Sequence, residues 1–271
     1  MDMYALANEW HVMNHLTAFL IGMPRLFAMA LVAPFLGTGV LEGQVWLVLV
    51  LGLYLPMHPV VLAELTPAVT LSFDINIALG GRLACLFLKE TLIGLVLGYL
   101  AGLPFWAVGS AGTFMDNQRG ASQAEGTEIL TGKSISPMGG VLFQVLVYLF
   151  YAGGAFMTFL GLVYATYAIW PVTQLLPVPN ATVPLFVAEK VAWLMAAVLL
   201  IAAPISVACL LVDIALGLIN RFSPQLNAYV LAMPIKSGLA SFLLCFYLGL
   251  FIKDSSHIFR YIDEFLYICY F

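Results

Sequence analysis

Six long apolar runs, separated by short polar segments, dominate the pattern of this chain. A membrane-spanning helix needs about 20 predominantly apolar residues, and every run is close to or beyond that length. The pattern therefore predicts an all-α polytopic membrane protein of about six to eight long helices, some of them paired as helical hairpins. The runs cover residues 12–36, 45–63, 77–108, 138–169, 186–219 and 235–252.

Three of the runs are longer than 30 residues. At about 1.5 Å per residue, such helices overshoot a hydrocarbon core of about 30 Å. They either project beyond the membrane or break, and Pro104, Gly153–Gly154 and Pro204 are the expected break points. We expect one integral membrane domain over residues 1–271, because the sequence shows no soluble domain, repeat or low-complexity tract.

Composition supports a membrane protein and excludes some other classes. The chain is 63% hydrophobic and 9% charged, whereas a soluble domain carries about 25% charged residues. With a net charge of −4 and no basic block, nucleic acid is not expected as a partner. The four cysteines form no C-x-x-C pair, so neither a metal site nor a disulfide framework is predicted.

A polar island between two apolar runs, at residues 110–137, concentrates groups that are scarce elsewhere in the chain. It contains the string MDNQRG at 115–120. Scarce polar residues in a membrane protein point to its function, so this island is the first candidate for a functional segment.

Ionisable residues also lie within the apolar runs, where they are costly if they face lipid. Lys89–Glu90 and Glu189–Lys190 are adjacent pairs of opposite charge. Sequence neighbours point about 100° apart on a helix, so we expect each member to meet a partner elsewhere. Asp213 and Arg221 are eight residues apart, roughly on one helix face, which fits either a structural salt bridge or a role in a conduit.

Glu90, Gly94, Gly98 and Gly102 recur every four residues and therefore share one helix face. Glycines remove side chains and let another backbone approach closely. This face is expected to pack against a helix, either within this chain or in a partner subunit.

No enzymatic or metal-binding motif is apparent. His11 and His15 have i, i+4 spacing but no adjoining acidic ligand, so no metal or other cofactor is predicted. No nucleotide loop, G-x-S-x-G elbow or H-E-x-x-H helix occurs, so no catalytic residue is assigned. An intramembrane hydrolase stays open only because Ser, Asp and His are all present.

Three segments together resemble the FliR/SctT family, the T component of the export apparatus of flagella and type III secretion systems. The first is residues 98–120, which holds PFWAV at 104–108 and ends in MDNQRG. The second is Ser136–Pro137 opening an apolar run, with Gly153–Gly154 further on. The third and most specific is 213–236, which ends in NRFSPQLNAYVLAMPIK. The PFWAV motif is more similar to injectisome members than to flagellar ones.

The resemblance implies a structural subunit of the export gate and not an enzyme. Family members assemble with small R-type and S-type membrane proteins, and one T subunit closes a helical ring. The U-type switch protein and other apparatus components are further implied partners. Unfolded secreted proteins would pass through the centre, and the implied location is the bacterial inner membrane.

The resemblance also implies roles for particular residues. Asp116, Asn117, Gln118 and Arg119 would form a polar loop near the channel or its gate. A second set would turn the chain or form ion pairs within or between subunits: Pro224, Gln225 and Asn227 for the turn, and Asp213, Arg221 and Lys236 for the pairs.

The alternative function is a secondary transporter of a small solute. Such a protein would need a midplane site on broken helices, for which Pro204 and Gly94 could supply the breaks. The two halves of the chain show no clear repeat. A transporter should work as a homomer, whereas a gate subunit should require partners.

Overall fold

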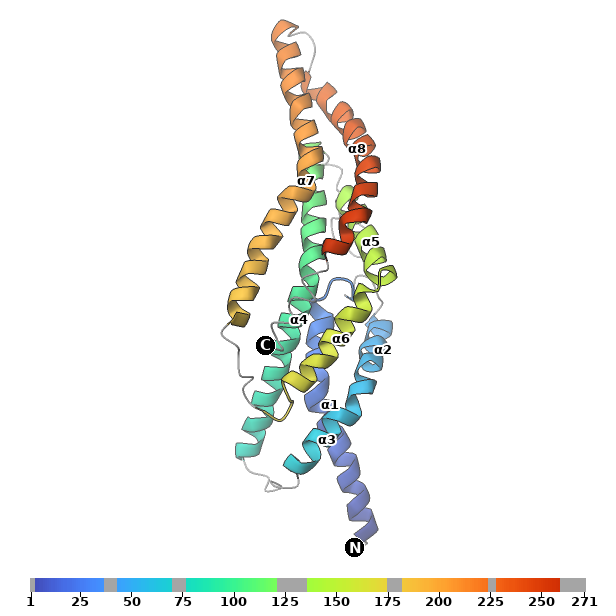
Figure 1. Cartoon of the computed structure of the whole chain (residues 1–271), viewed down its shortest axis with the longest axis vertical. Helices are drawn as coiled ribbons and strands as arrows, with labels where there is room; N and C mark the ends of the chain where they lie inside the picture. Colours follow the sequence, from blue (N-terminus) through green and yellow to red (C-terminus); the bar gives the residue numbers. More distant parts are fainter. Residues whose placement is uncertain are drawn as a thin grey trace. The chain divides into compact units, whose positions relative to one another are not determined.

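The structure is a computed structural model that describes residues 3–36, 43–69, 77–120, 136–174, 182–223 and 228–258. These residues form eight α-helices and one short 3-10 helix, without a strand (Figure 1). The elements are α1 (Met3–Val32), α2 (Gly43–Tyr54), η1 (Leu55–Met57), α3 (His58–Val69), α4 (Ile77–Gln118), α5 (Pro137–Ala152), α6 (Ala155–Ile169), α7 (Thr182–Phe222) and α8 (Ala228–Ile258).

Five stretches of the described helices are long and apolar enough to cross a membrane, or six if the bent pair α5 and α6 is one span. Helices satisfy their own backbone hydrogen bonds, so they suit a medium without water. The prediction of an all-α polytopic membrane protein is confirmed. The five stretches are Asn14–Val32, Gly43–Leu65, Leu83–Gln118, Ala188–Phe222 and Val230–Lys253.

The predicted break at Gly153–Gly154 is confirmed, but those at Pro104 and Pro204 are wrong. Helix α5 ends at Ala152 and α6 begins at Ala155, with Gly154 at a φ of +78° that glycine adopts easily. Helices α4 and α7 continue through Pro104 and Pro204. Prolines are tolerated in membrane helices because neighbouring helices and local adjustments satisfy the freed carbonyl groups.

The polar island begins as a helix and not as a loop. Helix α4 extends to Gln118, so Asp116, Asn117 and Gln118 form its last turn, and only Arg119 and Gly120 lie in a turn beyond it. The predicted polar loop is therefore wrong for the first three residues. Ala111 and Met115 are both fully buried, so α4 packs an apolar face inside the protein up to its polar end.

The chain divides into two compact units, and α4 contributes to both. Unit 1 comprises residues 1–102, 157–187 and 262–271, and unit 2 comprises 103–156 and 188–261. In unit 1, α1 packs against both α2 and α3. Its core contains a cluster of buried apolar side chains: Ala18, Ile21, Met57, Val61, Leu65, Leu86, Tyr167 and Val172.

The glycine face of α4 meets α1 of the same chain within unit 1. A Cβ at Gly94 would collide with the carbonyl oxygen of Arg25, and one at Gly98 would lie 2.6 Å from the carbonyl oxygen of Met29. Gly102, the last member of the predicted face, is also buried. The close approach of two helices explains why this face carries glycines.

In unit 2, α4 and α5 also cross at glycines. A Cβ added to Gly112 would collide with the backbone of Gly139. Nearby, the buried ring of Phe105 makes edge contacts with Phe143 and Phe150, at centroid distances of 5.9 and 5.4 Å. Helix α8 also contacts α5 in this unit.

Candidate functional site

A buried cluster of three charged side chains lies in unit 1. Arg25 on α1 and Glu90 on α4 are 0% exposed, and Lys89 on α4 is 8% exposed. Ionised groups enter an interior only when they are paired and hydrogen-bonded. The partners of these three side chains therefore decide what the cluster does.

All three nitrogens of the Arg25 guanidinium donate hydrogen bonds. Its Nε and one terminal nitrogen donate to the two carboxylate oxygens of Glu90 at 2.7 and 3.0 Å. The remaining bonds go to the Thr166 hydroxyl at 3.1 Å and to the Trp170 carbonyl at 2.9 Å. The Tyr167 ring lies under the guanidinium carbon at 4.1 Å, which adds a cation–π contact.

Lys89 joins the same carboxylate to the chain that follows α6. Its Nζ lies 2.7 Å from Glu90 Oε1. It also donates to three backbone carbonyls, those of Pro171, Val172 and Gln174, at 3.0, 3.3 and 2.9 Å. The expectation that each member meets a partner elsewhere is confirmed, by Arg25 for Glu90 and by these carbonyls for Lys89. The two also contact each other, because the long, flexible lysine side chain folds back across the helix surface.

The cluster carries two cations and one carboxylate, so the ion pairs of the described residues leave one positive charge without a carboxylate of its own. That charge lies beside the C-terminal end of α6 and the carbonyls just beyond it. A helix C-terminus is partially negative and leaves carbonyls without partners inside the helix. Arg25 and Lys89 therefore bind the carbonyls of Trp170, Pro171, Val172 and Gln174, which lie just beyond the end of α6.

The segment after α6 is held by apolar and acidic contacts as well. Val172 is fully buried in the apolar cluster of unit 1, and its N–H donates to Glu64 on α3 at 3.1 Å. We call Arg25, Lys89, Glu90 and Glu64, together with the segment 170–174 that they bind, the loop clamp. It connects α1, α3 and α4 to the end of α6, and its polar groups are occupied by one another.

A second polar cluster, in unit 2, joins α4 to α5. The Asp116 carboxylate accepts hydrogen bonds from Arg119 at 2.6 Å, from the Ser136 hydroxyl, and from the backbone N–H of Met138 at 2.9 Å. Asp116 is 2% exposed, so these bonds are made away from solvent. Ser136 also caps α5 by accepting from the Gly139 N–H at 3.1 Å. Asp116 thus fixes the end of α4 against the start of α5.

A third polar contact joins α7 to α8 within unit 2. Lys236 Nζ lies 2.9 Å from Asp213 Oδ1, and the Asp213 side chain is 40% exposed. Arg221 lies further along α7 in an exposed position. Of the pairings expected for Asp213, the structure shows the one with Lys236.

The other predicted site residues are distributed as follows. Asn117 is exposed and Gln118 is half-buried. Pro224, Gln225 and Asn227 lie outside the described residues. In the described part of the chain, no group of three or more His, Cys, Asp and Glu side chains is placed to hold a metal ion.

Sequence reasoning missed Arg25 as a site residue. Its only local signal was a charge inside an apolar run, because its partner Glu90 lies 65 residues away and its carbonyl partner 145 residues away. It also missed Glu64, Tyr167 and Ser136, whose roles depend on contacts between distant segments.

Comparison with known proteins identifies the family. Residues 16–262 match the family described as "Bacterial export proteins, family 1". The chain belongs to this family. It is 34% identical over 240 residues to the Yop proteins translocation protein T of Yersinia pestis, covering 87% of each chain. It is 30% identical over 258 residues to the surface presentation of antigens protein SpaR of Salmonella typhimurium, covering 93% of this chain and 90% of the relative.

A flagellar member of the family is also similar. The flagellar biosynthetic protein FliR of Bacillus subtilis is 29% identical over 157 residues, covering 58% of this chain and 61% of the relative. The resemblance to the FliR/SctT family is thereby confirmed, and these two secretion-system relatives, at 34% and 30% identity, are more similar to the chain than this flagellar one. This member of the bacterial export proteins, family 1, is accordingly a multi-pass membrane protein.

Proposed function

We propose that this chain is a structural, non-enzymatic subunit of the export gate of a type III secretion system in the bacterial inner membrane. Family membership over residues 16–262 is the observation that carries the proposal. A relative similar over most of its length is called a translocation protein, and another match is a "Secretion system apparatus protein" of Salmonella typhimurium.

The geometry supports a scaffold subunit. The charged groups of the loop clamp bind one another and backbone carbonyls, and Asp116 binds the start of α5. These contacts fix the ends of helices against each other. Such rigidity is expected of a structural subunit in a larger assembly. In this proposal R-type and S-type membrane proteins complete the channel, unfolded secreted proteins pass through it, and the U-type protein is a neighbouring component.

The exposed polar residues are the proposed contact points of the gate. Asn117 at the end of α4 and Arg221 at the end of α7 are exposed, and Asp213 is partly so. Within this proposal they contact the channel or a neighbouring subunit, as do Gln118, Pro224, Gln225 and Asn227. The residues that pack this chain together are a different group: Glu90, Gly94, Gly98 and Gly102.

Secretion by a deletion strain tests the proposal. Removing this gene should abolish export of all substrates of its secretion system, and a plasmid copy should restore it. The transporter alternative makes a different prediction: the purified chain alone, in liposomes, would take up a small solute. Normal secretion by the deletion strain would refute the gate function.

A further inference from the structure

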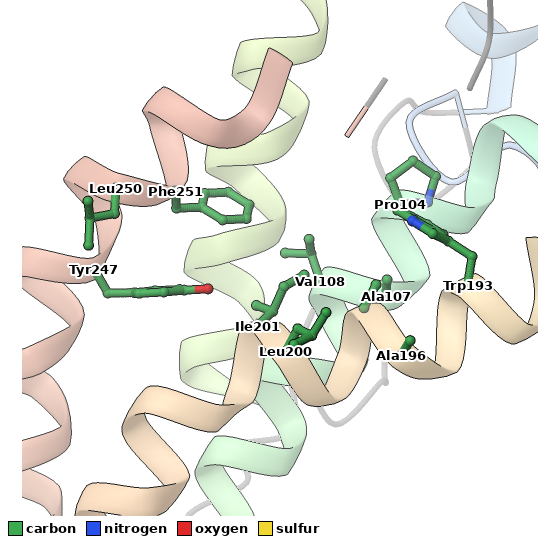
Figure 2. A pocket seen from close by; sticks show the side chains of 11 residues that line it. Pro104, Ala107, Val108, Trp193, Ala196, Leu200, Ile201, Tyr247, Leu250 and Phe251 are labelled. Carbon is green, nitrogen blue, oxygen red and sulfur yellow. The ribbon is translucent and has the colours of Figure 1, made fainter. Parts of the chain in front are cut away.

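Unit 2 contains an apolar cavity of about 310 Å³ among α4, α7 and α8 (Figure 2). Nine of its eleven lining residues have purely hydrocarbon side chains, and the other two are Trp193 and Tyr247. Each helix contributes residues at i, i+3 and i+4 spacing, such as Tyr247, Leu250 and Phe251 on α8. Three helix faces therefore converge on one space.

Small side chains create this space. Ala107 on α4 and Ala196 and Ala197 on α7 stand where larger residues would meet across the helices. In Figure 2 the Trp193 and Tyr247 side chains lie at opposite ends of the group. The volume is about twice that of an engineered apolar cavity of about 150 Å³ that stays dry and binds benzene, and it reaches the lower end of the range of about 300–1,000 Å³ typical of ligand sites.

The cavity extends from the exposed surface of unit 2 into its interior. Leu200 and Leu250 on its wall are 73% and 66% exposed, whereas Ala107, Ala197 and Phe251 are 1%, 8% and 4% exposed. The lining residues of all three helices lie within stretches long and apolar enough to cross a membrane. The open side of the cavity is therefore apolar enough to face hydrocarbon.

We propose that this cavity binds one acyl chain of a membrane phospholipid. None of its described lining residues carries a charge, so the cavity fits a tail and not a headgroup. A helix is about 10–12 Å across with its side chains, so a turn of a partner helix needs more than 310 Å³. A tail is thin and flexible, and it restores the contacts that the lining atoms of an empty cavity would lack.

Photolabelling of the full chain in its native membrane tests this site. Cells expressing the intact secretion system would be fed a fatty acid with a diazirine in the middle of its chain. After irradiation, the labelled residues would be mapped by peptide mass spectrometry. The expected result is label on the buried wall, at Ala107, Ala197 or Phe251, in addition to outward residues such as Leu211 and Leu218. Label on outward residues alone would overturn the proposal, because a protein side chain would then fill the cavity.

A variant that fills the cavity, compared with a matched control, tests the same site. Ala197→Leu places a larger side chain in the cavity, and Ala203→Leu makes the same change at an exposed position of α7. Ala197→Leu should abolish labelling of Ala107 and Phe251, whereas Ala203→Leu should leave it unchanged. Unchanged labelling of Ala107 and Phe251 in a folded Ala197→Leu protein would refute the site. If that variant does not fold, the label map of the unaltered chain decides alone.

Discussion

Arg25 and Glu90 lie 65 residues apart in the chain and form a two-point ion pair in which both side chains are fully buried. The planar guanidinium matches the two oxygens of a carboxylate, which gives this pair a fixed geometry. Lys89 shares the same carboxylate, so Glu90 is paired with both buried cations of the loop clamp, although its single charge balances only one of them. The stability of unit 1 should therefore depend strongly on Glu90.

Glu90→Gln should destabilise the protein by about 3–5 kcal/mol, since it leaves buried cations without their counter-charge. We expect a lower midpoint of thermal unfolding in detergent and a smaller amount of protein in the membrane. Glu189→Gln is the matched control, because Glu189 is exposed on α7. Equal unfolding midpoints for the two variants would mean that the ion pair contributes nothing to the fold.

Gly94→Ala should destabilise unit 1 by about 1–3 kcal/mol, the usual cost of overpacking. The added Cβ meets the Arg25 carbonyl and lies 3.0 Å from the Ala28 Cβ. Gly109→Ala on the same helix meets no atom within 4 Å. Because alanine has the higher helix propensity, this control should be neutral or stabilising by up to about 1 kcal/mol. Thermal unfolding of both variants measures the difference, and a stable Gly94→Ala protein would show that α1 and α4 are not in close contact.

Asp116→Ala should loosen the junction of α4 and α5. It removes three acceptor bonds, and hydrogen bonds to a charged group contribute about 1.5–3 kcal/mol each. We expect lower thermal stability together with impaired secretion. Asn117→Ala changes the next residue, whose side chain is exposed, and should leave stability unchanged. Hydrogen exchange at the start of α5 locates the effect, and unaltered protection of Met138 in Asp116→Ala would contradict the role of this carboxylate.

Reversing both charges of the Asp213–Lys236 pair should impair the protein less than reversing the charge of Asp213 alone. Asp213 is 40% exposed, so the isolated pair contributes little, about 0–1 kcal/mol. Asp213→Lys alone places two cations together and should lower secretion, whereas the double variant Asp213→Lys with Lys236→Asp should recover part of it. If Asp213 also contacts a neighbouring subunit, recovery of stability will exceed recovery of secretion. Equal secretion by the single and double reversals would exclude a functional pair.

The sequence predicts the helices well because their signal is local. Run lengths indicate the spans, and Ser136–Pro137 and Gly153–Gly154 mark helix ends through their own backbone chemistry. The continuation of α4 and α7 through Pro104 and Pro204 was not predicted, since the packing that supports a proline comes from other segments. Helix type and ends can thus be predicted more reliably than helix continuity.

The candidate site could be predicted only in part. Glu90, Gly94 and Gly98 were found from their spacing, which places them on one face of α4. The identity of the facing helix was not predictable, because a four-residue repeat does not indicate whether α1 or a partner chain supplies the other surface. The roles of Arg25 and Glu64 depend on a loop more than 100 residues away in the sequence. No local pattern carries such information.

The mass of the intact complex tests the central claim most directly. A tagged copy of this chain would be purified in mild detergent from cells that also express the neighbouring secretion genes, and native mass spectrometry would give its composition. The account predicts one copy of this chain together with several copies of small R-type and S-type membrane proteins. A stable homomer without such partners would contradict the export-gate function.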